Sequence, residues 1–288
     1  MHVLLVRNHK SGSADQVDPA ALLVRHGCVV TDAEIAQAAR WSDSPPGSLH
    51  DVDRVIVAGG DGSLGPCAAL AARLEVPIGV VPAGTANDFV RATGLPDDAD
   101  RACLLAATGD RTRPIDLGRV DEVPFVNVAS IGLAPKAAAA AEPLKRGLGA
   151  IAYPIGAAIA AIRSRPVDVS ARIDGNLVWS GPAWQVMVAS TGAFGGWAEI
   201  GSTQPGDGAL DLVVVPAGRG TRALAFDAKS LFDGELARRD GVHHDRGRQV
   251  ELALHRAPSM VVDGEIVQLD DRRVVARVEP DPVQLVVG

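Results

Sequence analysis

The sequence has few cysteines, and none of them is paired. Cys28, Cys67 and Cys103 are the only three among 288 residues, and no two of them form a C-x-x-C motif. An odd, unclustered set of cysteines predicts neither a disulfide framework nor a zinc site, and it favours a reducing cytosol. The chain also lacks a Ser/His/Asp or Cys/His pattern of the kind that nucleophilic catalysis uses.

Long hydrophobic runs are absent as well. The most apolar segment, residues 147–162, is rich in alanine and glycine, is interrupted by Pro154, and is shorter than the ~20 residues of a membrane-spanning helix. We expect an amphipathic or core helix there instead. The apolar run at the N-terminus is short and ends at a polar turn, which predicts a first strand rather than a signal peptide.

Positive charge is not in excess. The chain has 28 basic and 35 acidic residues and a net charge of -7, which argues against broad nucleic-acid binding because such proteins need a basic face. We interpret the small basic clusters first as solvated charges at helix ends, with a membrane-surface patch as the alternative. These clusters are Lys145/Arg146, Arg163/Arg165 and Arg238/Arg239.

Hydrophobic residues make up 47% of the chain, which is ample for a buried core. Up to residue 117, apolar β-branched runs alternate with alanine-rich helical patterns, which is typical of β-α-β units around a parallel sheet. The predicted strands are 2–7, 28–30, 54–58 and 78–81. The predicted helices are 19–25, 32–39, 64–74 and 99–108.

From residue 118 the pattern changes to closely spaced strands joined by turns. Helical pieces around 148–162 and 221–236 interrupt strands predicted at 125–129, 167–173, 177–179, 184–189, 210–215, 250–255, 260–262 and 274–278. We therefore predict an α/β domain over 1–117 and a mostly antiparallel β domain over 118–288, with a cleft between them. The last strand, 283–288, could pair in either domain.

Glycines follow the third predicted strand in the segment RVIVAGGDGSLG, residues 54–65. A strand-to-helix turn of this kind points backbone N–H groups at one spot, and glycines let phosphate oxygens approach closely. Gly60, Gly62 and Gly65 also match the dinucleotide fingerprint G-x-G-x-x-G. That fingerprint should follow the first strand, with an acidic residue at the end of the next strand. Here the next strand ends in Pro82-Ala83-Gly84, so another kind of phosphate site is favoured.

A second glycine turn follows the fourth predicted strand. In VVPAGTANDFVRATGLP, Gly84 and Thr85 form the turn, and Asn87 and Asp88 begin a helix. Two neighbouring parallel strands would then line one pocket with backbone amides, the hydroxyls of Ser63 and Thr85, and carboxylates able to organise a magnesium ion. This set of groups is suited to binding a polyphosphate.

The two loops resemble the diacylglycerol kinase catalytic-domain family, which includes bacterial lipid kinases and the sphingosine and ceramide kinases. GGDGS is similar to the family's G-G-D-G-T, and PAGTANDFVR to its P-x-G-T-x-N-D-[FL]-[AG]-R. Weaker similarities cover nearly the whole chain in family order. They are NHKSG at the first strand end, DLGR at 116–119, FVNVASIG at 125–132, GDGALDLVVV at 206–215 and VDGE at 262–265.

This resemblance implies an NAD kinase/phosphofructokinase-like α/β domain that binds nucleotide and a C-terminal antiparallel β-sandwich domain that receives the lipid. The active site would lie in the cleft between them. It implies an ATP- and magnesium-dependent lipid kinase that phosphorylates a hydroxyl of a diacylglycerol-like lipid. Such an enzyme would be cytoplasmic and bind a membrane surface transiently. We expect no nucleic-acid partner, and a homodimer is left open.

The resemblance also assigns roles to individual residues. Glu265 would be the general base, with Asp263 as a helper and Asp61 facing the phosphates across the cleft. From the residues alone, Asp263-Gly264 is also a good hairpin pair. The expected nucleotide-binding residues are Asn8, Ser11, Gly12, Thr31, Gly59, Gly60, Asp61, Gly62, Ser63, Gly84, Thr85 and Asn87.

Two metal sites are implied in the same way. The Asp88 carboxylate would act on phosphate through a magnesium-bound water. A structural magnesium ion would use the Asp207 carboxylate with the carbonyls of Gln204 and Ala209, because hard oxygen ligands on a turn suit magnesium. The residues alone also permit simpler interpretations: a polar turn at 204–209 and helix-start residues at Asp61 and Asp88.

Two departures from the family pattern keep other functions open. His9 stands where the family usually has proline, and Leu64-Gly65-Pro66 replaces its x-N-E. One alternative is a soluble kinase of the NAD kinase type, since G-G-D-G alone also fits those enzymes. Another is a nucleotide-binding regulatory module that has lost catalysis. Turnover of ATP with lipids separates such a module from an active kinase.

Overall fold

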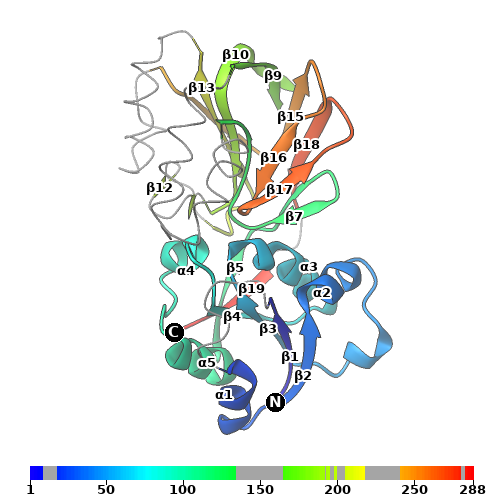
Figure 1. Ribbon diagram of the computed structural model, residues 1–288, viewed down its shortest axis with the longest axis vertical. Coiled ribbons are helices and arrows are strands. Elements are labelled where there is room, and N and C mark those ends of the chain that lie inside the picture. The colour runs from blue at the N-terminus through cyan, green and yellow to red at the C-terminus, as the bar shows by residue number, and fades with distance from the viewer. Residues whose placement is uncertain are drawn as a thin grey trace.

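The computed structural model describes residues 1–8, 18–133, 165–191, 193–194, 198–199, 205–217, 241–279 and 283–288. Two large sheets divide this part of the chain into two domains, one above the other in Figure 1. The predicted helical pieces at 148–162 and 221–236 lie outside the described residues, as do the basic clusters apart from Arg165. Within the described ranges, no helix is long and apolar enough to cross a membrane.

The first sheet has six strands in the order β2-β1-β3-β4-β19-β5. All of its pairings are parallel except the one between β19 and β5, which confirms the predicted parallel sheet. The strands are β1 (His2–Arg7), β2 (Val29–Glu34), β3 (Arg54–Gly59), β4 (Ile78–Pro82), β5 (Arg111–Ile115) and β19 (Val283–Val287).

Helices cover both faces of this sheet, because its central strands are apolar on both sides. α2 (Ile35–Trp41) and α3 (Leu64–Leu74) pack on the face that holds the buried even-numbered residues of β1. α1 (Pro19–Arg25) and α5 (Ala99–Thr108) pack on the face that holds its odd-numbered residues. The short helix α4 (Asp88–Thr93) follows β4, and single turns η1 (Gly47–Leu49) and η2 (Asp61–Ser63) precede β3 and α3.

Several predicted boundaries are wrong: the predicted strand 125–129, for example, spans the end of one strand at Phe125 and the start of the next at Val128. Another such boundary has a clear local cause. The sequence predicts a helix over 32–39, but β2 continues to Glu34 and α2 begins at Ile35. The cause is a capping box, in which the Glu34 side chain accepts from the helix backbone while the Gln37 side chain accepts from the Glu34 amide at 2.9 Å. Asp32 lies in the strand and accepts a 2.6 Å hydrogen bond from Arg7 Nη2.

The terminal strand, which the sequence pattern leaves unassigned, lies in the first sheet. β19 pairs in parallel with β4 through Leu285 and Ile78, and antiparallel with β5 along its whole length. The chain therefore leaves the first domain after β5, builds the second domain, and returns to lie between β4 and β5. Two connections join the domains as a result.

The second sheet is antiparallel and contains eleven strands around a buried aliphatic core, which confirms the predicted β-sandwich-like domain. Its main order is β17-β16-β8-β10-β9-β15-β18-β6-β7, and β13 and β14 extend it from β10. A separate pair, β11 (Ala193–Phe194) and β12 (Ala198–Glu199), lies beside it. The strands are β6 (Gly118–Val120), β7 (Val123–Phe125), β8 (Val128–Gly132), β9 (Val167–Ile173), β10 (Asn176–Ala189), β13 (Leu210–Pro216), β14 (His243–Gly247), β15 (Gln249–Leu254), β16 (Ser259–Val262), β17 (Glu265–Gln268) and β18 (Arg273–Val278).

β10 joins two strands that the sequence predicts separately, at 177–179 and 184–189. Gly181 and Pro182 lie between them and suggest a break, because neither residue favours a strand interior. The strand instead continues through two register shifts, one against β9 between Leu177 and Trp179 and one against β13 between Ala183 and Gln185. Bulges of this kind accommodate such residues without ending the pairing.

The start of α3 contacts the second domain. A Cβ added to Gly65 would lie 2.3 Å from the carbonyl oxygen of Pro124 in β7, so the helix can approach this closely only because residue 65 is glycine. Pro66 lies in the first turn of the same helix, where a missing N–H costs nothing. The departure from the family's x-N-E therefore falls at a contact between the domains.

Candidate active site

Two glycine loops meet at the carboxyl end of the parallel sheet. The first follows β3 and the second follows β4, and the amide of Ala83 donates to the carbonyl of Gly59 at 2.9 Å. A Cβ on Gly60 would lie 3.1 Å from Gly84 Cα, and one on Gly84 would lie 2.5 Å from Gly60 Cα. The two predicted loops are thus in direct backbone contact, which larger residues would prevent.

Side chains from neighbouring strand ends fix these loops. Asn8, at the end of β1, donates from Nδ2 to Ser63 Oγ at 3.0 Å. Asn87 accepts from the Gly84 amide at 3.0 Å, and its backbone φ of +50° turns the chain into α4. The structure therefore brings together Asn8, Gly59–Ser63, Gly84 and Asn87, while Thr85 is exposed on the second loop.

Of the other predicted nucleotide-binding and metal-binding residues, three lie outside the described residues and one nucleotide-binding residue lies away from these loops. Ser11, Gly12 and Gln204 lie outside the described residues. Thr31 lies in the middle of β2, level with Leu4, and its hydroxyl is 2.8 Å from Nε2 of His2. Because Leu4 precedes Asn8 by four residues of extended chain, Thr31 lies roughly 13 Å from Asn8 along the direction of the strands.

Asp61 connects the first loop with both the second loop and the second domain. Its Oδ1 accepts from the amide of Phe89 at 2.9 Å and from Asn127 Nδ2 at 3.1 Å. Its Oδ2 accepts from the amide of Asp88 at 3.1 Å. Asp61 therefore caps the N-terminus of α4, which follows the second loop. It does not cap α3, the helix that follows Asp61 in the sequence. Asp88 is the first residue of α4 and pairs with Arg91 one turn later.

Asp263 holds the β16–β17 hairpin against the start of β8. Its side chain accepts from the amides of Val126 at 2.8 Å, Asn127 at 2.9 Å and Val128 at 3.0 Å. The residue is 7% exposed, and burial raises its pKa to about 7, although the three amides favour the charged form. Asp263 also takes a φ of +46°, which the turn before Glu265 requires. These contacts give Asp263 a clear positioning role.

Glu265, the next residue but one, reaches the first glycine loop. A Cβ added to Gly62 would lie 2.6 Å from Glu265 Cγ and 3.0 Å from its Oε1. The hairpin of the second domain thus places a carboxylate against the first glycine loop of the first domain. This juxtaposition is the arrangement that an acid or base at a phosphoryl group requires.

Asn127 and Asp116 are buried polar residues for which the sequence analysis gives no role. Asn127 is 3% exposed, donates to Asp61, and accepts from Thr191 Oγ1 at 2.6 Å. Asp116 lies between the domains and accepts from the amides of Gly206 and Gly208 at 2.9 and 3.1 Å. Burial raises the pKa of Asp116 while these amides lower it. Both residues occur in motifs noted above, FVNVASIG and DLGR, as polar positions within apolar surroundings.

Comparison with known proteins agrees with this geometry. Residues 2–120 match the family model described as "Diacylglycerol kinase catalytic domain", and residues 127–287 match the one described as "YegS C-terminal NAD kinase beta sandwich-like domain". This chain belongs to the diacylglycerol kinase family. The resemblance drawn from the two loops is thereby confirmed.

Individual relatives place the chain among lipid kinases. A "Probable lipid kinase YegS-like" of Pseudomonas fluorescens is 34% identical over 233 residues, which cover 78% of this chain and 74% of the relative. The "Diacylglycerol kinase" of Bacillus subtilis is 29% identical over 223 residues, covering 76% and 73%. These names support kinase chemistry on a lipid.

Solved structures support the fold. A putative diacylglycerol kinase from Bacillus anthracis has a TM-score of 0.78 at 22% identity and covers 100% of this chain and 97% of its own. An NAD kinase from Archaeoglobus fulgidus in complex with ATP has a TM-score of 0.53 at 14% identity, covering 100% and 94%. The two-domain architecture expected from the resemblance is therefore confirmed at the level of fold.

Proposed function

We propose that this protein transfers the γ-phosphoryl group of ATP to a hydroxyl of a diacylglycerol-like lipid. The observation that carries the proposal is the position of Glu265, whose side chain lies directly against Gly62 of the first glycine loop. A base at this position can take the proton from an alcohol as it attacks a phosphate held by the loop. The names of the relatives support a lipid as the acceptor.

The first domain would bind the nucleotide at the ends of its parallel strands. Backbone amides of the Gly59–Ser63 and Gly84–Asn87 loops would hold the phosphates, because glycines there leave room for oxygen atoms. Phosphoryl transfer depends on positioning and charge stabilisation more than on covalent chemistry, so a rigid pair of loops is suited to it. Glu265 would contribute the only proton transfer in this scheme.

A magnesium ion beside these loops would share the carboxylates of Asp61 and Asp88 with their protein partners, because Asp61 accepts from three N–H groups and Asp88 pairs with Arg91. Asp61 and Asp88 offer hard oxygen donors where the two loops touch, and they approach each other through the hydrogen bond from the Asp88 amide to Asp61. When bound, the ion would neutralise the charge of the β- and γ-phosphates. The hydrogen bonds of Asp61 to the amides of Asp88 and Phe89 hold the first loop against the start of α4.

The acceptor would approach along the β16–β17 hairpin. Ile266, which follows Glu265 in β17, is 51% exposed and leaves an aliphatic side chain uncovered on the opposite face of the hairpin. Exposed aliphatic groups of this kind suit a lipid better than a second nucleotide. The enzyme would therefore reach its substrate at a membrane surface as a peripheral protein.

The test is transfer of labelled phosphate from ATP to vesicles that each contain one class of lipid alcohol. We expect transfer to diacylglycerol-containing vesicles, and we expect Glu265→Gln to lower kcat by about two to four orders of magnitude because it keeps shape and removes basicity. The affinity for ATP should stay nearly unchanged. The matched control is Glu122→Gln, which alters an exposed carboxylate in the β6–β7 turn.

The outcomes separate the alternatives. Transfer to no lipid, together with tight ATP binding, would favour the regulatory module. Transfer to NAD would favour the soluble kinase. Full turnover by Glu265→Gln on an accepted lipid would place the base elsewhere.

A further inference from the structure

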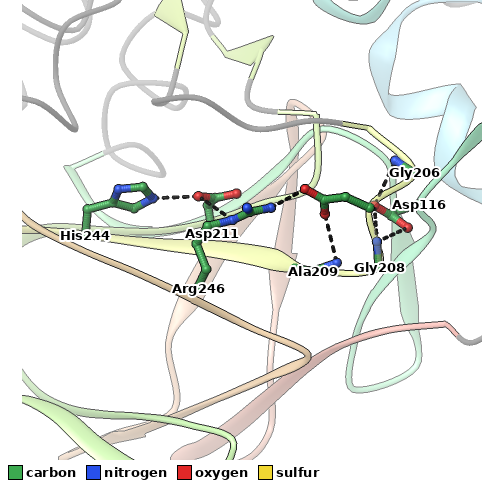
Figure 2. A network of polar contacts seen from close by, with 8 residues as sticks. Asp116, Gly206, Gly208, Ala209, Asp211, His244 and Arg246 are labelled. Atoms are coloured by element: carbon green, nitrogen blue, oxygen red, sulfur yellow. Dashed lines mark hydrogen bonds and ion pairs between the residues drawn. The ribbon is translucent and has the colours of Figure 1, made fainter.

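The turn before β13 carries an arrangement of charges that differs from the one implied by the resemblance. A structural magnesium ion was expected there, held by Asp207 and by the carbonyls of Gln204 and Ala209. Figure 2 shows this turn with Asp116 on one side and Arg246 on the other. The contacts of Asp207 decide whether its carboxylate is available to a metal.

Both oxygens of Asp207 already have protein partners. Oδ2 forms an ion pair with Nη2 of Arg246, and Oδ1 accepts from the amide of Ala209 at 3.1 Å. Arg246 lies in β14, directly opposite Asp211 of β13. The hydrogen bond with Asp207 raises the pKa of Arg246 above its ordinary value, so the guanidinium carries its full charge here.

The backbone of the turn is also arranged for an anion. Gly206 and Gly208 have φ values of +87° and +76°, and their amides point to the buried carboxylate of Asp116 (Figure 2). Successive N–H groups that converge in this way form an anion-binding nest. A cation would need oxygen atoms on the same side of the turn. The amides of the turn therefore already bind a carboxylate, that of Asp116, which lies in the segment that joins the two domains.

Arg246 has a second acidic partner. Asp211 is 0% exposed, and its Oδ1 lies 3.3 Å from Arg246 Nε and 2.5 Å from His244 Nε2. Within the described part of the chain, Oδ2 of Asp211 has no hydrogen-bond partner. Asp211 therefore makes both of its contacts with His244 and Arg246 through Oδ1. One guanidinium thus bridges two carboxylates of the same strand end, Asp207 and Asp211, and Figure 2 shows Arg246 beside Asp211.

We infer that the Arg246 guanidinium takes the place of a divalent cation at this turn, so that the turn is held without metal. The planar guanidinium suits the role because it offers several N–H donors in fixed directions and keeps its charge at any working pH. Removing it would leave Asp207 without its ion-pair partner and Asp211 with His244 alone. A divalent cation is the ordinary partner of two such carboxylates. This inference does not depend on the proposed lipid kinase activity.

Thermal unfolding without nucleotide tests the inference directly. The melting temperatures of the wild type and of Asp207→Asn are measured in excess EDTA and in a magnesium titration. A metal held by Asp207 would make the wild-type Tm rise with magnesium by mass action. We expect the wild type and Asp207→Asn to respond to magnesium equally. A wild-type gain in Tm that Asp207→Asn lacks would overturn the inference.

Arg246→Met provides the complementary measurement. It should lower Tm by roughly 3–6 °C, because it leaves Asp207 without its ion-pair partner and Asp211 with His244 alone. Magnesium should recover part of this loss, and Asp207→Asn in the same background should abolish the recovery. Absence of any recovery would mean that metal and guanidinium do not share a site, and would also overturn the inference. If Arg246→Met does not fold, the comparison of wild type with Asp207→Asn still decides the question.

Discussion

Gly60 and Gly84 touch through their Cα atoms, and this contact sets the spacing of the two loops that the sequence marks as phosphate-binding. Each loop can be recognised from its own glycines after a buried strand. Their contact cannot, because it depends on the pairing of β3 with β4. The sequence motif is therefore enough to predict each loop, whereas the contact between the loops follows only from the packing of the strands.

Gly60→Val should lower the affinity for ATP at least about tenfold, since a side chain there would push the loops apart and displace several phosphate-binding amides. Fluorescence titration with an ATP analogue measures the effect. Gly47→Val is the matched control, because a Cβ at Gly47 has no heavy atom within 4 Å. Equal affinities in both variants would contradict the assignment of the nucleotide site.

Asp263 carries a prediction about pH. Its pKa is raised to about 7 in the folded protein, so the folded state holds this proton more tightly than the unfolded chain, where an aspartate titrates near about 4. The contribution of Asp263 to the free energy of unfolding is therefore largest below about pH 4 and declines as the pH rises to about 7.

Asp263→Asn cannot titrate, so its cost in stability should shrink as the pH rises through this window. Urea unfolding of wild type and Asp263→Asn at pH 5 and at pH 8, values that bracket the pKa of about 7, measures the difference. Asp168→Asn, an exposed change on β9, is the control. A cost that grows with pH would show that the three amides hold the carboxylate charged, and that its pKa in the folded protein is low.

At the scale of elements, the β16–β17 hairpin is the part of the second domain that completes the site. The Asp263-Gly264 pair after an apolar strand predicts a hairpin, and the family pattern adds a base at Glu265. The contact of Glu265 with Gly62 cannot be predicted from these residues, because it depends on how the two domains pack against each other. The same holds for Asn127, which reads as one polar residue in an apolar strand and proves to link Asp61 to the hairpin.

Asn127 should act as a positioning residue for the transfer reaction. Asn127→Asp places a carboxylate beside Asp61, so we expect kcat to fall at least about tenfold at pH 8 with a smaller change in the KM for ATP. Lowering the pH should restore part of kcat, because a protonated carboxyl can again donate to Asp61. Asn127→Ala has no such donor and should show no recovery, which separates positioning from a general loss of folding.

Strands that carry charge were the hardest elements to predict. β14 consists of His243–Gly247 and lacks the alternation of apolar residues, since its side chains serve Asp211 and Asp207. β5 is an exposed edge strand with Pro114 next to its last residue, and it becomes a strand only because β19 pairs with it. Apolar strands such as β1, β3 and β9 were predicted at their observed positions, because burial of both or alternate faces leaves a clear pattern.

At the scale of the whole molecule, β19 joins the two domains into one structure. Leu285 is fully buried in the core of the first domain, and its strand separates β4 from β5. Leu285→Ala should lower the free energy of unfolding by about 2–5 kcal/mol through lost burial and the remaining cavity. Urea unfolding measures this loss, and Gln284→Ala on the exposed side of the same strand is the control. Equal losses in the two variants would contradict the central position of β19.

The path of β19 also determines when the first domain can be completed during synthesis. Domains of a growing chain usually fold in order, as each leaves the ribosome. Here the strand between β4 and β5 is translated only after the entire second domain. Until then β4 has an open edge, which is a site for proteolysis and for pairing with other chains. A nascent or truncated chain therefore has an unfinished first sheet, and only molecules that already carry Glu265 can complete it.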